Sequence, residues 1–263
     1  MNLGWLALML MGGPLQTTPR YADPLPYLAL PPALEDRLVY YRSFNAPGGK
    51  PEIDQLAAKE LQAPVIGEGG LLGHCGVTGG PGKALLRLKS PGLSPAGPLT
   101  IMFWWSLPAG CAPNSGYGLL GLTGRGYISI FGRGGPWCGL SDVGAVLQCW
   151  SMDGIKNVND IYDFRIRETL SLAQRGGWHH TALTVAGGRT VAVCTDGLPV
   201  TSVQLEGRPI GPQDDLTTLD LGADGGDGTL LAEVMVFQRT LTADEIADYV
   251  TAVRGLRAVG RLP

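Results

Sequence analysis

The sequence predicts an all-β protein, a sandwich of two antiparallel sheets that is followed by one short helix. Gly supplies 40 and Pro 20 of the 263 residues, a density typical of many short strands joined by turns. Hydrophobic residues make up 44% of the chain and charged residues only 16%, so a chain of this length can bury one large core. The third observation is a run of Leu, Val, Met and Phe at residues 230–237, which suits a strand buried on both faces.

Residues 1–35 are predicted to form an extended arm outside the sandwich. Residues 1–11 are apolar but too few for a transmembrane span, which needs about 20 apolar residues. Five prolines between residues 19 and 32 favour extended chain over helix. We expect the arm to bury its apolar side chains against another protein subunit of an assembly, which includes a second copy of this chain. The side chains expected to make this contact are Trp5, Leu6, Leu8, Met9 and Leu10.

The alternative for this segment is a secretory signal peptide at residues 1–20, which would be cleaved from the mature chain. No Lys or Arg precedes the apolar run, and no cleavage site of small residues follows it. These two features favour the arm over the signal peptide.

The sandwich is predicted to occupy residues 36–255, with a C-terminal tail at residues 256–263. It opens with a strand at residues 38–44 that is rich in aromatic residues. A charged surface excursion is expected at residues 46–60, and the next strand at residues 84–88.

Residues 99–107 form the clearest strand of the sequence. Their period-two alternation places Phe103 and Trp105 on one face, which belongs in the core between the sheets. Met102 and Trp104 lie on the second face, which is also partly apolar. We therefore expect another segment to cover that second face.

The middle of the chain alternates strands with turns. The expected strands are residues 117–122, 127–131, 143–150, 178–185, 190–195 and 198–203. A long polar insertion at residues 151–172 separates the first three from the last three. The final two strands are joined by Asp196-Gly197, the strongest two-residue signal for a hairpin.

A complete helix start follows the last strand. Thr242 can cap the helix with its hydroxyl, and Glu245 three residues later closes a capping box. Leu241 is placed to pack onto Ile246 as a hydrophobic staple. Apolar residues then repeat at helical spacing, and Gly255 is the expected stop.

Taken in this order, the segments resemble the laminin-G-like domains of the concanavalin A-like lectin and glucanase superfamily over residues 36–253. The segments that carry the resemblance are Leu38-Val39-Tyr40-Tyr41 with Phe44, the strand from Leu99 to Trp105, Trp178-His179-His180-Thr181, Val191-Ala192-Val193 with the Asp196-Gly197 turn, and the last strand with its helix. The resemblance implies an antiparallel jelly-roll β-sandwich, a fold that mostly serves recognition or scaffolding and only in some families catalysis. The family often has an acidic pair at the start of the last strand, where this chain has Ala232-Glu233.

No catalytic arrangement emerges from the residues. Retaining glycosidases use two carboxylates about 5–5.5 Å apart, which this fold carries on a Glu-x-Asp-x-x-Glu motif. Glu52 and Asp54 have that spacing, but Ala57 replaces the second Glu, so the leaving oxygen would lack its proton donor. The neighbouring His179 and His180 point to opposite faces of a strand and cannot readily share one ligand. For one of them we expect a structural hydrogen bond across the sandwich, and we expect the chain to be no enzyme.

Glycan-binding candidates are the aromatic and polar side chains near turns, because sugars stack on exposed rings and bond to Asn and Asp. They are Trp137, Trp150, Asn157, Asn159 and Asp160. Calcium takes several oxygen ligands from such loops, and Asp153, Asp160 and Asp163 could supply them. Asp, Asn and Gly equally make simple turns, and no other cofactor is expected.

The net charge of −3 comes without a basic stripe, which argues against nucleic acid as a partner. The five cysteines have no CxxC spacing, so the sequence indicates no zinc site. Long-range disulfides and buried free thiols both remain open for them.

Three functions are consistent with these observations. The first is a non-catalytic structural or interaction protein that its arm docks into a larger assembly, such as a decoration or tail component of a phage virion, with glycan binding as an added role. The second is a secreted or cell-surface carbohydrate-binding module, which requires the signal peptide. The third is a glycan-active hydrolase, which lacks a visible pair of carboxylates. We expect the first, located on a virion or at an extracellular surface.

Overall fold

The computed structural model describes most of the predicted sandwich. The described residues are 32–68, 70–77, 86–106, 117–123, 126–133, 144–151, 162–166, 177–187, 189–204, 217–222 and 230–258. They form two antiparallel sheets followed by a C-terminal helix, which confirms the predicted fold class of an antiparallel β-sandwich with a closing helix.

The first sheet has nine strands. In spatial order its main path is β14 (Leu198–Gln204), β13 (Thr190–Thr195), β12 (Trp178–Ala186), β7 (Leu99–Ser106), β16 (Leu230–Phe237), β1 (Leu38–Arg42) and β2 (Ile53–Asp54). Two short strands, β4 (Val65–Gly67) and β5 (Cys75–Val77), extend it where β5 pairs with β16. The central pair is therefore β7 and β16, the two most apolar segments of the chain.

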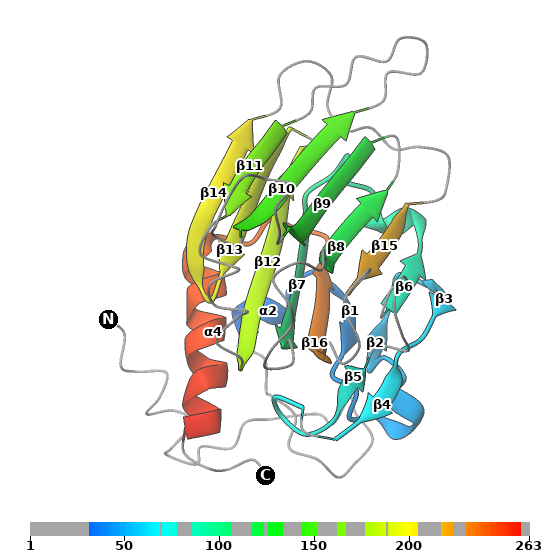
Figure 1. Ribbon diagram of the computed structural model, residues 1–263. Helices are drawn as coiled ribbons and strands as arrows, with labels where there is room; N and C mark the ends of the chain where they lie inside the picture. The colour runs from blue at the N-terminus through cyan, green and yellow to red at the C-terminus, as the bar shows by residue number, and fades with distance from the viewer. Residues whose placement is uncertain are drawn as a thin grey trace.

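The second sheet has seven strands. In spatial order they are β11 (Tyr162–Ile166), β10 (Gly144–Ser151), β9 (Gly126–Arg133), β8 (Tyr117–Thr123), β15 (Thr218–Leu221), β6 (Leu86–Lys89) and β3 (Lys59–Gln62). Figure 1 shows the two sheets stacked face to face. The edge strand β11 of this sheet approaches the edge strand β14 of the first.

The core between the sheets is apolar and draws on both of them. Phe103 and Trp105 of β7 are 1% and 0% exposed and lie in one cluster with Leu88 of β6, Leu122 of β8 and Leu219 of β15. The predicted orientation of β7 is thus confirmed. The alternation in the sequence was sufficient for it, because only one face of the strand can meet the opposite sheet.

The outer face of the first sheet is covered by the helix α4 (Ala243–Ala258), as Figure 1 shows along β13 and β14. Met102 and Trp104 are buried there in a second cluster with Ile246, Tyr249 and Val253 of the helix. The covering segment that the apolar second face of β7 required is therefore the C-terminal helix.

The predicted helix start is confirmed, but the predicted stop is wrong. The Glu245 N–H donates to Thr242 Oγ1 at 3.2 Å, and the Thr242 N–H donates to Glu245 Oε2 at 2.8 Å. The helix continues through Gly255 to Ala258, so the first residues of the predicted tail are helical. Leu256 packs against the second cluster, and such packing outweighs the cost of about 1 kcal/mol for a glycine in a helix.

Two segments that looked polar contain edge strands. Residues 46–60 include β2, which pairs with β1, and the start of β3, which pairs with β6. Leu56 between them is buried in the inter-sheet core. The polar insertion at 151–172 likewise contains β11, which pairs with β10. β2 and β3 contain few apolar residues, as an edge strand can. β11 does alternate Tyr162, Phe164 and Ile166 with charged residues, but over only five positions inside a polar segment.

The last residues of the predicted arm belong to the domain. Residues 32–35 form a short helix, α2 (Pro32–Glu35), and Leu34 is buried in the second cluster. For these four residues the prediction of an extended chain that contacts another protein was wrong. They are helical, and Leu34 packs onto the sheet of its own domain. Residues 1–31 lie outside the described residues. Among the described helices none is long and apolar enough to be a membrane span.

Candidate functional site

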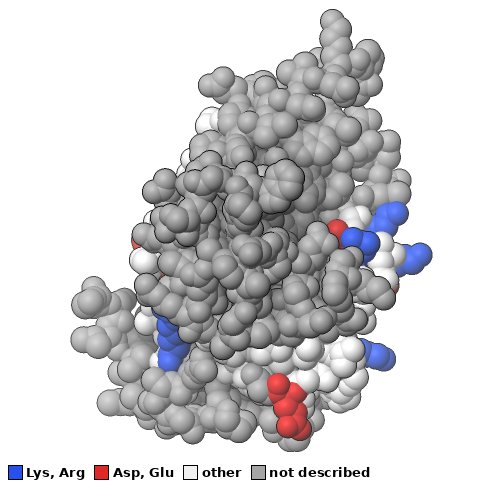
Figure 2. All heavy atoms as spheres, in the orientation of Figure 1, with Lys and Arg blue, Asp and Glu red and all other residues white. Residues whose placement is uncertain are grey.

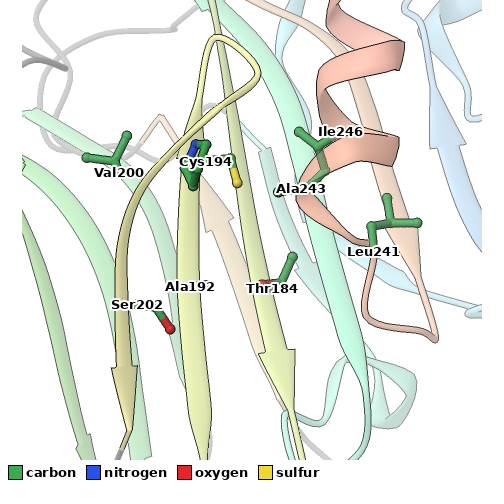
Figure 3. Close-up of a pocket in the computed structure, with 9 residues that line it drawn as sticks. Thr184, Ala192, Cys194, Val200, Ser202, Leu241, Ala243 and Ile246 are labelled. Atoms are coloured by element: carbon green, nitrogen blue, oxygen red, sulfur yellow. The ribbon is translucent and has the colours of Figure 1, made fainter. Parts of the chain in front are cut away.

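A groove of about 320 Å³ lies on the outer face of the first sheet, between strands β12 to β14 and the start of α4. Its strand side is formed by Thr184, Ala192, Cys194 and Val200, and its helix side by Leu241 and Ile246. Figure 3 shows Leu241 and Ile246 beside the strands that carry Thr184, Ala192 and Cys194. None of the described residues that line the groove is charged.

The local sequence explains the hollow. Outward positions of β12 and β13 carry short side chains, Thr184 and Ala192, which lie opposite each other, and the β7 residue opposite Thr184 is also small, Thr100. The helix contacts the turn between β13 and β14 closely. A Cβ atom added to Gly197 of this turn would lie 3.2 Å from the Cα atom of Ala247 in α4. Short side chains beside that close contact leave room between the strands and the first turn of the helix.

The hairpin turn that touches α4 is the two-residue turn predicted from the sequence. Asp196 and Gly197 both have positive φ, 54° and 84°, as the tight turn between β13 and β14 requires. The Asp196 carboxylate joins three elements. It lies 3.0 Å from His179 Nδ1, accepts from the His180 N–H at 3.0 Å, and lies 2.8 Å from Arg254 Nη2 of the helix.

These contacts give the acid a structural role. Burial alone would raise the pKa of Asp196, but the hydrogen bonds from His179 and from the His180 N–H outweigh burial and hold this pKa below its ordinary value. The hydrogen bond expected from a histidine exists, but its position was wrong. His179 bonds to a turn of its own sheet, because that turn folds back over β12, and not across the sandwich.

The second histidine lies on the outer face, as the alternation predicted. His180 is fully buried between the rings of Trp104 and Tyr249, at centroid distances of 5.2 and 5.5 Å. Neither ring nitrogen has a hydrogen-bond partner among the described atoms. Burial, which disfavours the charged imidazolium, lowers the pKa of His180 to about 3, so the ring is neutral at physiological pH.

A buried carboxyl group lies elsewhere on the same outer face. Glu233 occupies a bulge in β16 with a φ of 50° and is only 1% exposed. The Tyr41 hydroxyl donates to Glu233 Oε2 at 2.6 Å. Burial raises the pKa of Glu233 to about 8, and the charge of Glu52 adds to the effect.

Glu233, with its raised pKa, and the neighbouring Glu52 superficially resemble the two carboxyl groups of a glycosidase. Their environment argues against catalysis. Glu233 is sealed under the outer cluster, and the Glu52 carboxylate accepts hydrogen bonds from the Ser43 hydroxyl and, at 3.0 Å, from the Ser43 N–H. Asp54 accepts from the Ala58 N–H at 3.2 Å. The described carboxylates of this region therefore serve the fold.

Most of the predicted ligand residues lie outside the described residues. These are Trp137, Asn157, Asn159, Asp153 and Asp160, together with the arm residues Trp5, Leu6, Leu8, Met9 and Leu10.

The backbone places two of the predicted ligand residues on adjacent strands. Trp150 is in β10 opposite Tyr127, and Asp163 is in β11 opposite Gln148. The predicted glycan and calcium sites thus stay predictions. Within the part of the chain that the structure describes, no three His, Cys, Asp or Glu side chains gather as metal ligands would.

Neither the groove nor the contacts of Asp196 with His179, His180 and Arg254 were predicted from the sequence. In Figure 2 the described Lys and Arg side chains that are visible lie at separate places along the margin of this face. One signal in the sequence could have indicated the groove: small outward residues in β13 beside a helix that must cover the same face.

The family model of the concanavalin A-like lectin/glucanases superfamily matches residues 85–247. The chain belongs to this superfamily. The sequence of this chain matches no protein of curated function.

Similar solved structures are binding domains of toxins. The binding domain of Paraclostridial Mosquitocidal Protein 1 has a TM-score of 0.60 at 16% identity, over 82% of this chain and 52% of that one. The binding domain of Botulinum neurotoxin DC in complex with rat synaptotagmin II has a TM-score of 0.55 at 9% identity, over 82% and 52%.

A structure concerning botulinum neurotoxin type C and two ganglioside molecules has a TM-score of 0.55 at 8% identity, over 83% and 51%. The chain therefore spans about half the length of these domains, and at such identities the likeness concerns the fold.

Proposed function

We propose that this superfamily member is a non-catalytic binding domain that recognises a glycan and is carried by a larger assembly. The observation that carries the non-catalytic part of the proposal is that Glu233 and Glu52 are buried or hydrogen-bonded within the fold. The acid with the raised pKa, Glu233, is 1% exposed, and Glu52, whose charge contributes to that raised pKa, is hydrogen-bonded to Ser43. A sugar cannot reach a carboxyl group that the outer cluster covers.

The fold supports binding over hydrolysis. The toxin domains with this fold are named for binding, and their titles mention a protein receptor, synaptotagmin II, and gangliosides. A sandwich presents strand ends and loops as a rigid surface on which aromatic and amide side chains can contact a sugar. Trp150 at the end of β10 is the aromatic residue that this proposal uses.

The test measures binding and turnover on the same glycan panel with the full chain. We expect binding to at least one glycan with no hydrolysis. Trp150→Ala should weaken it at least tenfold, whereas Trp178→Ala, which alters a half-buried Trp packed on the second cluster, should leave it unchanged. Hydrolysis that is abolished by Glu233→Gln or Glu52→Gln would overturn the proposal in favour of a glycosidase.

For the assembly we propose a virion surface, with the apolar arm as the attachment. The support is the apolar run at residues 1–11, which a soluble domain has little reason to expose. Mass spectrometry of the native chain should find Met1 or Asn2 at the N-terminus and the protein in purified particles. A mature N-terminus near Tyr21 would instead support a secreted carbohydrate-binding module.

A further inference from the structure

We propose that the groove between β12–β14 and α4 receives the apolar segment of residues 5–11 from a second copy of this chain. The proposal rests on the proposed role in an assembly, and it is independent of glycan binding. It gives the predicted arm a defined docking site and makes the contact head-to-tail, from the arm of one copy to the groove of the next.

The chemistry of the two surfaces is complementary. The described residues that line the groove have apolar, hydroxyl or thiol side chains, including Ala192, Leu241 and Ile246, and none of them is charged. Residues 1–18 likewise contain no Lys, Arg, Asp or Glu, and six of the seven residues from Trp5 to Met11 are large and apolar. The volume of about 320 Å³ suits two or three such side chains.

The origin of the arm places it on the correct face. The described chain begins at α2, where Leu34 packs in the same cluster as Leu241 and Ile246 of the groove. The arm therefore leaves the domain from the face that carries the groove.

The proline-rich spacer favours a second copy over the same chain. A stretch from residue 19 to residue 31 would span about 40 Å in polyproline conformation. The radius of gyration of a domain of this size is about 17 Å. A spacer of that length would carry residues 5–11 about the width of the domain away from α2, far enough to reach a neighbouring copy.

Complementation between two variants tests the proposal on the full chain. The arm variant carries Leu8→Asp and Leu10→Asp, and the groove variant carries Ala192→Glu, with Ser202→Glu, at an exposed lining residue of β14, as a second groove variant in case the first unfolds. Arg189→Glu, in the exposed turn before β13, is the matched control. Light scattering after size-exclusion chromatography measures the mass, and circular dichroism checks the fold.

We expect the native chain and the control to self-associate, and each variant alone to be monomeric. A 1:1 mixture of arm and groove variants should form a heterodimer, because one intact arm then meets one intact groove. Glycan binding by the monomeric arm variant should stay unchanged, so failure of this inference is distinguishable from failure of the proposed function.

Three outcomes would overturn the proposal. They are a native chain that is monomeric or lacks residues 1–11, self-association that survives in a folded groove variant, and a mixture without heterodimer. A monomeric native chain would place the arm in the groove of its own chain or on another protein, and a mixture without heterodimer would show that the arm and the groove of two copies do not bind each other.

Discussion

The two faces of the first sheet bury similar apolar side chains but differ in their polar groups. On the inner face the buried histidine, His179, has a carboxylate partner in Asp196. On the outer face His180 and Glu233 are buried deeper, at 0% and 1% exposure, and among the described residues neither is in an ion pair. A sheet thus covers one face with apolar groups, whereas a helix and short loops cover the other and enclose titratable ones. We therefore expect the stability of the domain to depend on pH mainly through the buried groups of the outer face.

The largest expected effect is the loss of stability when a buried Trp is truncated, and it should differ between the two faces of the first sheet. Trp105→Ala should lower the free energy of unfolding by about 3–5 kcal/mol, because two sheets cannot close over the cavity. Trp104→Ala should cost less, since α4 is joined to the sheet at one end and can settle toward the space. Urea denaturation of both variants measures the difference. An equal or larger loss for Trp104→Ala would show that the outer face is packed as rigidly as the inner one.

The next effect concerns Glu233. Its pKa is about 8 in the folded chain and 4.5 in the unfolded chain, so between these values the folded state holds the extra proton. Glu233 therefore makes its full contribution to the free energy of unfolding at low pH. This contribution should fall by about 3 kcal/mol as the pH rises from 5 to 7.5. Glu233→Gln keeps an acceptor for Tyr41 and should abolish the loss. Urea unfolding at a series of pH values would contradict this if the variant and the native chain had parallel profiles.

His180 should act with the opposite sign. Its pKa is about 3 in the folded chain and 6.5 in the unfolded chain, so the unfolded state binds the proton first as pH falls. Stability should drop by about 2 kcal/mol from pH 6.5 to 4.5 on account of this ring. In the native chain this loss opposes the gain from Glu233, and the net profile is flat there and declines only from pH 6.5 to 8. His180→Phe, which keeps an aromatic ring, should reveal the Glu233 slope alone over the whole range. A flat profile for that variant would count against the assignment.

The smallest expected effect lies at the edge of the outer face. Thr242→Ala removes the cap of α4 and should lower stability by about 1 kcal/mol. Thr251→Ala is the matched control, because Thr251 is exposed in the middle of the same helix and alanine is the better helix former there. Thermal unfolding of the two variants should move in opposite directions. A shift of the same sign in both would show that the capping box does not limit helix stability.

The sequence alone determined the elements whose pattern is local. The alternation in residues 99–106 and the apolar run in residues 230–237 identified the two central strands, and Thr242 with Glu245 identified the start of the helix. Period-two alternation, turn residues and caps act between residues that are neighbours along the chain. For the same reason the Asp196-Gly197 hairpin could be predicted with its turn.

Only the tertiary structure decided the position of the groups that meet over long distances. Tyr41 and Glu233 are 192 residues apart in sequence, and their hydrogen bond depends on β1 and β16 being neighbours. The edge strands β2, β3 and β11 formed where charged segments met an open sheet edge. The groove exists because a helix from the C-terminus lies over the small side chains of β13. Such contacts depend on which elements become neighbours, and burial then sets the pKa of Glu233, which no local pattern contains.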